Sequence, residues 1–367
     1  MILNICILMH TTVTSMPAIS SNQHVQHPQR VMLITYPRTA SNLLIKMLSL
    51  EDQKNVLSNR MGGYFFWDAY MKGRRNGHIY KPIAHWTADD IEETRQLFQQ
   101  CVDNLEDMSQ AAEAQDKVLF GKEHVSWFAN PAVTSGHLFD DDDGSEDQYA
   151  MPFCLDFPER YGSASAFSPE NPTVLPDEYL KSWTQTFLIR HPALAFPSFY
   201  RAMNSLHDEG CADPHELIPL MKLSSTLWWT RQLYEWCCKN SANTLTGHGS
   251  ERERLPIVLD AEDIIHSPSV LLRYCELVGL DPGKVKFQWN NQTKQSNVIE
   301  AVMKATLDHS SGLLPEKTPA IIDISAEADT WIDEFGEEVG KLIEKLVRDA
   351  MPDYEFLRER RLKVAHK

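Results

Sequence analysis

Residues 31–46, with the sequence VMLITYPRTASNLLIK, most constrain how this 367-residue chain can fold. Residues 31–36 are almost all apolar or β-favouring, which is typical of a strand buried on both faces. Pro37 ends this strand because proline cannot donate a hydrogen bond to a sheet. Ser41 or Asn42 can cap the following segment, whose apolar residues recur at helical spacing. The stretch therefore predicts a buried strand, a tight turn and a helix.

The predicted turn has the properties of an anion-binding site. The first backbone N–H groups of a helix are free, and the helix dipole is positive there. Arg38 adds a cation, and Thr39 and Ser41 add hydroxyl donors. A plain strand-to-helix corner with a solvated arginine is the alternative. The ATP-binding signature G-x-x-x-x-G-K-(S/T) is absent, which counts against an ordinary P-loop kinase or ATPase.

Residues 117–124, KVLFGKEH, predict a second buried strand that ends in three polar groups. Strand alternation places Lys122 and His124 on one face and Glu123 on the other. A cation and a base on the same side of a strand end can act on one reacting centre. The alternative is that His124 is a buried structural histidine whose hydrogen bonds are satisfied.

A third strand is predicted at residues 186–189, followed at once by Arg190 and then by a short helix that Pro192 opens. Ser198 follows Arg190 by eight residues, on or near that helix. An arginine and a hydroxyl in this arrangement can converge on a phosphate. Ligands of open α/β sheets lie outside the carboxyl ends of strands, where Arg38, His124 and Arg190 all fall.

The net charge of −16 argues against a general binder of nucleic acid or of anionic membranes. A phosphate site in this chain must therefore be a local cluster of cations. The seven cysteines are scattered without metal-binding spacing, which fits a reducing, cytoplasmic compartment. The acidic run at residues 140–147 does not fit a calcium loop, because Phe139 falls where the first aspartate is needed. We therefore expect no metal site.

The chain divides into a flexible leader at residues 1–28, one α/β domain at residues 29–355 and a solvated basic tail at residues 356–367. The apolar run at residues 1–9 is too short to span a bilayer. Within the domain, we expect one helix from Asp213 to about residue 238.

Two further segments bear on the core and on the ligand. An amphipathic helix is expected from Ser325 to about residue 348. The aromatic residues at 64–70, with Trp86, Trp127 and Trp229, form either a wall for an apolar ligand or part of the core.

Together, these segments resemble the sulfotransferases that use 3′-phosphoadenosine 5′-phosphosulfate (PAPS). The family's phosphosulfate loop, T-Y-P-K-(S/T)-G-T-T-W, is similar to TYPRTASNL at residues 35–43. Its strand ending in K-(S/T)-H is similar to Lys122, Glu123 and His124. Its 3′-phosphate motif, R-x-P-x-x-x-x-x-S, matches Arg190 and Ser198 at the right spacing. The matches run from residue 31 to about residue 280, in the family's order.

The resemblance implies a P-loop-type, doubly wound α/β fold with a mainly parallel sheet and helices on both faces. It implies transfer of a sulfuryl group from PAPS to an acceptor hydroxyl or amine, with adenosine 3′,5′-bisphosphate (PAP) as product and no metal. Because of the aromatic residues named above, we expect the acceptor to be small and largely apolar. His124 would be the general base, with Lys122 and Arg38 stabilising the leaving phosphate. The donor would be held by residues of two motifs: Arg38, Thr39, Ala40, Ser41, Asn42, Arg190 and Ser198. Neither nucleic acid nor a membrane is expected as a partner, and a homodimer is compatible with these features.

The chain departs from the family pattern in the loop and near the C-terminus. Arg38, Ala40 and Asn42 replace the usual Lys, Gly and Thr, and an alanine disfavours the positive φ that glycine allows. The family's C-terminal R-K-G-x-x-G-D-W is absent, so Lys294, Lys304 or residues 310–312 are candidates to replace it. The alternative function is therefore a diverged protein that binds a nucleotide without sulfation, or that catalyses another step.

Overall fold

The computed structural model describes residues 29–59, 62–139, 153–162, 166–240, 244–246, 252–254, 256–290, 297–318 and 321–364. The predicted leader, the acidic run at 140–147 and Lys294 lie outside the described residues.

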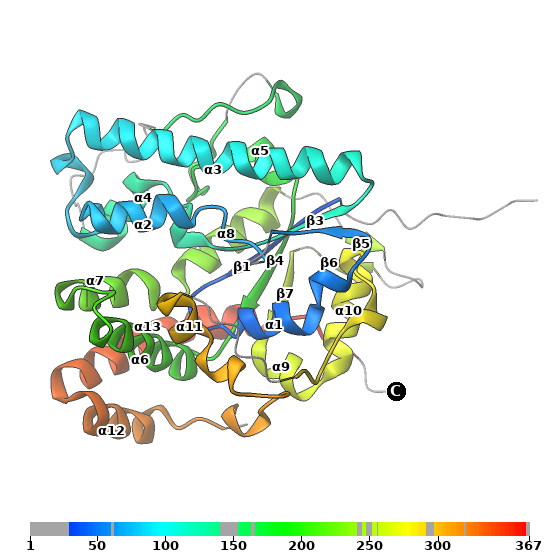
Figure 1. Ribbon diagram of the computed structural model, residues 1–367. Helices are drawn as coiled ribbons and strands as arrows, with labels where there is room; N and C mark the ends of the chain where they lie inside the picture. The colour runs from blue at the N-terminus through cyan, green and yellow to red at the C-terminus, as the bar shows by residue number, and fades with distance from the viewer. Residues whose placement is uncertain are drawn as a thin grey trace, which may run out of the picture.

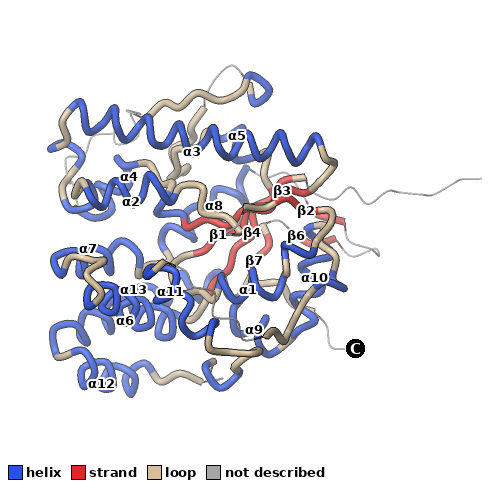
Figure 2. The backbone as a smooth tube through the Cα atoms, viewed as in Figure 1, coloured by secondary structure: helices blue, strands red, loops and turns tan. Residues whose placement is uncertain are grey.

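A five-stranded sheet forms the centre of the described structure (Figure 2). All four neighbouring strand pairs are parallel, which confirms the predicted parallel sheet. The order across the sheet is β2 (Val56–Leu57), β3 (Val118–His124), β1 (Arg30–Thr35), β4 (Thr184–Ile189) and β7 (Ile257–Asp260). A separate antiparallel pair is formed by β5 (Thr244–Thr246) and β6 (Arg252–Arg254).

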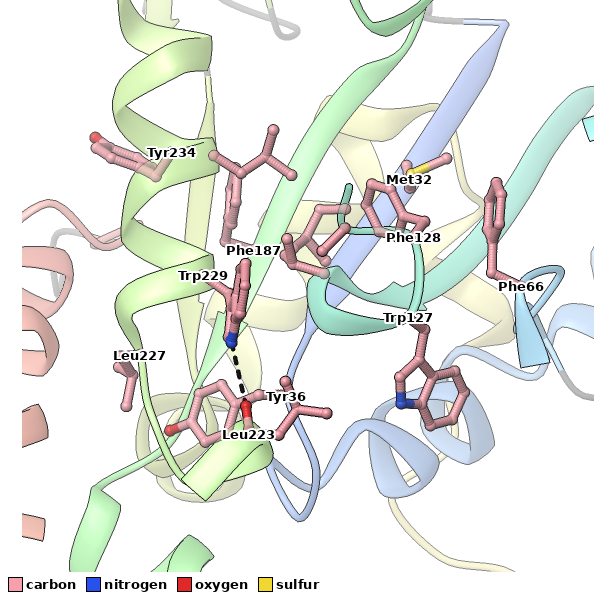
Figure 3. Packing of buried hydrophobic residues seen from close by; sticks show 14 of the residues in the cluster. Met32, Tyr36, Phe66, Trp127, Phe128, Phe187, Leu223, Leu227, Trp229 and Tyr234 are labelled. Carbon is pink, nitrogen blue, oxygen red and sulfur yellow. Dashed lines mark hydrogen bonds between the residues drawn. The ribbon is translucent and has the colours of Figure 1, made fainter. Parts of the chain in front are cut away.

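Side chains of the central strand β1 alternate between two hydrophobic clusters, one on each face of the sheet. Val31 and Leu33 pack with α1 (Ser41–Leu48), α9 (Ala261–His266) and α10 (Pro268–Val278). Met32 and Ile34 pack in the larger cluster of the other face, which Figure 3 shows in part. That face is covered by α3 (Ala88–Ala114), α6 (Pro192–Asp208), α8 (Trp228–Asn240) and α13 (Glu337–Glu359) (Figure 1). Helices on both faces are thus confirmed.

The other helices among the described residues are α2 (Trp67–Arg75), α4 (Pro131–Phe139), α5 (Asp177–Lys181), α7 (Pro214–Ser224), α11 (Val298–Asp308) and α12 (Ile324–Phe335). Two helix predictions were wrong. The helix expected from Asp213 to residue 238 is broken into α7 and α8, because Ser225 has a non-helical ψ of 60°. The helix expected from Ser325 is broken into α12 and α13 at Gly336, where φ is 86°. Glycine allows this conformation at little cost.

The C-terminal end packs against the sheet instead of lying in solvent. Arg358 pairs with Glu262, and Arg361 pairs with Asp263 at 2.5 Å. Leu362 is buried, and its N–H donates to the carbonyl of Val258 on β7. The expected solvated tail is therefore wrong as far as Leu362. No helix among the described residues is both long and apolar enough to cross a membrane.

Candidate functional site

The turn between β1 and α1 lies at the carboxyl edge of the sheet and has an unusual backbone. Arg38 and Ala40 have φ values of 67° and 65°. Ala40 is the N-cap of α1 and provides no side-chain cap, so the prediction that Ser41 or Asn42 caps the helix was wrong. The expectation that an alanine would avoid positive φ was also wrong. The first N–H groups of α1 are consequently left without a capping side chain, and they remain suited to an anion.

The predicted residues Arg38, Arg190 and Ser198 lie together at this turn. Arg38 Nε donates a hydrogen bond to Ser198 Oγ at 3.0 Å, and Arg190 Nη1 donates to the carbonyl oxygen of Arg38 at 3.0 Å. The Tyr36 hydroxyl accepts from the Arg190 N–H and donates to the Arg190 carbonyl. Thr39 turns inward, and its hydroxyl donates to the Tyr36 carbonyl at 3.0 Å. The ends of β1 and β4 thus hold two arginines side by side.

His124 is buried at the end of β3, directly opposite Thr35 in the β1–β3 register. Its Nδ1 lies 2.6 Å from Thr35 Oγ1, and its Nε2 lies 3.4 Å from the Tyr64 hydroxyl. The Thr35 hydroxyl donates to the carbonyl of Glu123 at 3.2 Å. With its proton used there, Thr35 Oγ1 accepts from Nδ1–H of the imidazole. This arrangement favours the tautomer whose lone pair is on Nε2.

Lys122 and Glu123 point to opposite faces of β3, as the strand alternation predicted. Lys122 Nζ donates to Asn42 Oδ1 at 2.8 Å and lies 4.1 Å from the centre of the Tyr64 ring. The carboxyl group of Glu123 instead accepts from the N–H groups of Phe65 and Phe66. Lys122 therefore lies at the start of α1, and Glu123 is directed away from it.

Tyr64 joins the arginine cluster to the histidine cluster. Its hydroxyl is hydrogen-bonded to Ser41 of the turn, and its charge interaction with Arg38 affects the pKa of that guanidinium. The same hydroxyl faces His124 Nε2. Tyr64 thus connects the predicted residues at the ends of β1 and β4 with those at the end of β3.

The electrostatics of this site favour an anionic ligand. Burial lowers the pKa of Arg38 and of Arg190, and burial together with the nearby Lys304 lowers the pKa of Lys122 to about 7. Within the part of the chain that the structure describes, these three cations donate to hydroxyl, amide and carbonyl oxygens and not to carboxylates. Poorly solvated cations without a counter-ion are stabilised when an anion binds.

The titration of His124 differs from that of a surface histidine. Burial, and next the positive charge of Lys122, lower the pKa of His124 to about 3. The imidazole is therefore neutral at physiological pH, and its Nε2 can accept a proton. Burial raises the pKa of Glu123 to about 8, so this carboxyl group is protonated near neutral pH and adds little negative charge.

The segment that carries Tyr64 lies against β3 through a close backbone contact at Gly63. The Tyr64 N–H donates to the Lys122 carbonyl at 2.6 Å, and a Cβ on Gly63 would lie 2.1 Å from that oxygen. We predict that Gly63→Ala lowers the free energy of unfolding by about 2–4 kcal/mol because the segment must leave the strand. Chemical denaturation measures the change. Gly73→Ala on α2 is the control, because a Cβ there meets nothing within 4 Å; equal stability of the two variants would contradict this packing.

Aromatic side chains surround His124 and line a neighbouring cavity. The Trp127 ring meets the imidazole edge-on at 4.4 Å between centroids, and Tyr64 lies 4.7 Å from Trp127. A cavity of about 60 Å³ extends beyond Trp127, with Tyr70, Trp86 and Phe98 also in its wall. Phe66, Trp127 and Trp229 are buried in the core (Figure 3). The expectation that these aromatics belong to the core is therefore confirmed for these three residues, and a role as the wall of a ligand site stays a prediction.

The sequence reasoning missed how Thr35 and Tyr64 contact His124. In the sequence, Thr35 stands only as part of the loop motif, and Tyr64 only as one of several aromatic residues. The contact of Thr35 with His124 could be predicted only if the pairing and register of β1 and β3 were already known. The two glycines before Tyr64 were visible in the sequence, but their close approach to Lys122 was not.

Comparison with known proteins gives the family. No family model matches the chain. It is 38% identical over 349 residues to sulfotransferase ppzF of Metarhizium rileyi (strain RCEF 4871), covering 93% of this chain and 98% of the relative. It is 39% identical over 344 residues to sulfotransferase ppzF of Metarhizium majus (strain ARSEF 297), covering 92% and 98%.

The sulfotransferase domain from the curacin biosynthetic pathway aligns with 11% identity and a TM-score of 0.37, over 84% of this chain and 98% of that domain. The two relatives of 38% and 39% identity match along nearly their whole length. The chain therefore belongs to the sulfotransferase family of enzymes.

Proposed function

We propose that this sulfotransferase uses PAPS as donor and transfers its sulfuryl group to a hydroxyl or amine of a small, largely apolar acceptor. One observation carries the proposal: two half-buried arginines, Arg190 and Arg38, and the buried Lys122 form a row beside a neutral His124. Among the described residues, none of the three forms an ion pair with a carboxylate. A doubly phosphorylated donor supplies the anions that such a row needs, and the imidazole supplies a base next to them.

Two groups of residues would hold the donor. Arg190 and Ser198 would bind the 3′-phosphate. Arg190 Nε is a suitable donor because it is buried and, among the described residues, has no hydrogen-bond partner. The turn would bind the phosphosulfate through the free N–H groups of α1 and the nearby side chains. The residues of the turn are Arg38, Thr39, Ala40, Ser41 and Asn42. Held at both ends, the donor is fixed in one orientation, which favours a single line of attack.

The proposed chemistry is a direct transfer. PAPS supplies an activated sulfur bonded to a phosphate oxygen. The acceptor oxygen or nitrogen forms a bond to that sulfur while His124 Nε2 takes its proton. The bond from sulfur to the bridging oxygen breaks, and its electron pair stays on PAP. Lys122 and Arg38 would stabilise the charge that develops on that oxygen, and Thr35 would keep the imidazole in the required tautomer.

The surroundings of His124 support an apolar acceptor. Tyr64 and Trp127 flank the imidazole, and the cavity beyond Trp127 has aromatic side chains in its wall. Aromatic walls bind apolar ligands through burial of surface, and a few polar groups then set the orientation.

The pH dependence of the reaction should follow Lys122 and not His124. Because the pKa of Lys122 is lowered to about 7, its ammonium group is charged below that pH and loses its proton as the pH rises through it. We predict that kcat/KM falls above about pH 7, with no fall on the acid side until the protein itself is affected. In Lys122→Arg the alkaline fall should disappear, because a guanidinium stays charged. An unchanged alkaline fall in this variant would contradict the assignment of Lys122.

Transfer of labelled sulfate from PAPS to a panel of phenols and aliphatic alcohols tests the proposal. Formation of a labelled product by the wild type supports it. Binding of PAP without transfer to any member of the panel would favour the alternative, a diverged protein that binds nucleotide without sulfation. If neither PAP nor PAPS binds, both are excluded.

A further inference from the structure

Helix α11 lies against the turn that would hold the donor. It packs on α1 and on α6, between which it is seen in Figure 1. Its middle turn makes a direct contact: Arg38 Nη1 donates to the carbonyl oxygen of Met303 at 2.7 Å. Among the described residues, the Arg38 guanidinium has no carboxylate partner, and its hydrogen bonds go to this carbonyl and to the Ser198 hydroxyl. The Met303 oxygen thus occupies a position at Arg38 that suits an oxygen of an anion.

The residue after Met303 adds a further cation to the same place. Lys304 is half-buried, and its charge repels that of Lys122 strongly enough to be the second cause of the lowered pKa of Lys122. Lys122 in turn lies at the start of α1 through its bond to Asn42. The chain has 51 acidic residues, yet among the described residues the ion pairs of lysines with carboxylates do not include Lys122 or Lys304.

Two like charges held near one another are unfavourable unless something of opposite charge lies between them. Lys286, by contrast, pairs with Asp52 at the surface. An anion bound near Lys122 and Lys304, beside the free N–H groups of α1, would offset their repulsion.

We propose that Lys304 binds the 5′-phosphosulfate end of the donor, and that Arg38 exchanges the Met303 carbonyl for a donor oxygen when PAPS binds. The inference rests on the proposed function and goes further, because it assigns a binding residue where the family's C-terminal motif is missing. Of the other candidates, Lys294 lies outside the described residues. Residues 310–312 are used within the fold: the Ser310 hydroxyl donates to Leu307, and Gly312 forms a β-bridge with Gln288.

Binding of two nucleotides separates the two ends of the site. PAP carries phosphates at both the 3′ and the 5′ position, whereas adenosine 3′-monophosphate lacks the 5′-phosphate. Lys304→Ala should weaken PAP binding by about tenfold, as expected for one charged hydrogen bond, and should leave the affinity for adenosine 3′-monophosphate unchanged. Ser198→Ala should weaken both. Isothermal titration calorimetry measures PAP, and competition against PAP measures the monophosphate.

Three further variants and measurements make the test specific. Lys341→Ala changes the net charge equally, but this exposed lysine is on α13 and pairs with Glu337, so both affinities should stay as in the wild type. Lys304→Arg should restore most of the PAP affinity. The melting temperature of ligand-free Lys304→Ala should equal or exceed that of the wild type, because a repulsion with Lys122 is removed.

The outcomes distinguish this inference from the proposed function. If the wild type binds PAP and Lys304→Ala binds it equally well, Lys304 is not a donor residue and the inference is overturned. An equal loss for PAP and for the monophosphate would also overturn it, because Lys304 would then act through the whole fold. If the wild type itself does not bind PAP, the proposed function is wrong, and the inference that rests on it is wrong as well.

Discussion

Replacing His124 with alanine is expected to lower kcat for sulfuryl transfer by about 100- to 10,000-fold, the usual contribution of a positioned general base. The affinity for PAP should remain that of the wild type, because His124 faces Tyr64 and Trp127 and the proposed donor contacts come from the turn and from Arg190. Steady-state kinetics with a labelled donor, together with calorimetry of PAP binding, measures both quantities.

Two variants control this experiment. His215 lies exposed on α7, and His215→Ala should have wild-type activity. Thr35→Val removes the hydroxyl that holds Nδ1, so it should lower kcat by about tenfold without a comparable rise in KM. Wild-type kcat in His124→Ala would show that another group takes the proton, and the mechanism proposed here would be wrong.

Replacing Arg190 with alanine should weaken PAP binding by about 100-fold, the second large effect that we expect. This arginine is half-buried, its buried Nε has no hydrogen-bond partner among the residues that the structure describes, and its Nη1 supports the turn at Arg38. The variant therefore loses a direct charged contact with the 3′-phosphate and also the support of the loop. Ser198→Ala should have a smaller effect, about tenfold or less, because one neutral hydroxyl is lost.

Helix α6, which begins two residues after Arg190, offers a matched control. Arg201 lies on α6 and pairs with Glu334 on the protein surface, so Arg201→Ala changes the net charge equally without touching the site. Its PAP affinity should match that of the wild type. If Arg190→Ala and Arg201→Ala bind PAP equally well, the 3′-phosphate does not bind where we place it. Arg190→Lys should recover only part of the affinity, because an ammonium group cannot replace the forked guanidinium.

The sheet and the approximate position of the site could be predicted because they depend on strong local signals. The apolar runs that form β1, β3 and β4 are buried on both faces. Strands of this kind are typical of the centre of a parallel sheet that helices cover on both sides. Once these strands are parallel and adjacent, Arg38, His124 and Arg190 fall at one edge. The alternation along β3 likewise separated Lys122 from Glu123 correctly.

Features that depend on tertiary contacts could not be predicted in the same way. Ala40 has a positive φ although an alanine disfavours it locally, so the surrounding packing must stabilise the turn. The break at Gly336 occurs inside a sequence whose apolar spacing is continuous, and only the packing of α12 on α13 shows it. The contact of Met303 with Arg38 joins residues 265 positions apart, and nothing in either segment alone indicates it.

A crystal structure of the protein with PAP tests the central claim most directly. The account predicts the 3′-phosphate within hydrogen-bonding distance of Arg190 and Ser198, the 5′-phosphate at the start of α1, and His124 Nε2 facing the space left for the acceptor. PAP bound at another surface, or with its 3′-phosphate away from Arg190, would contradict it.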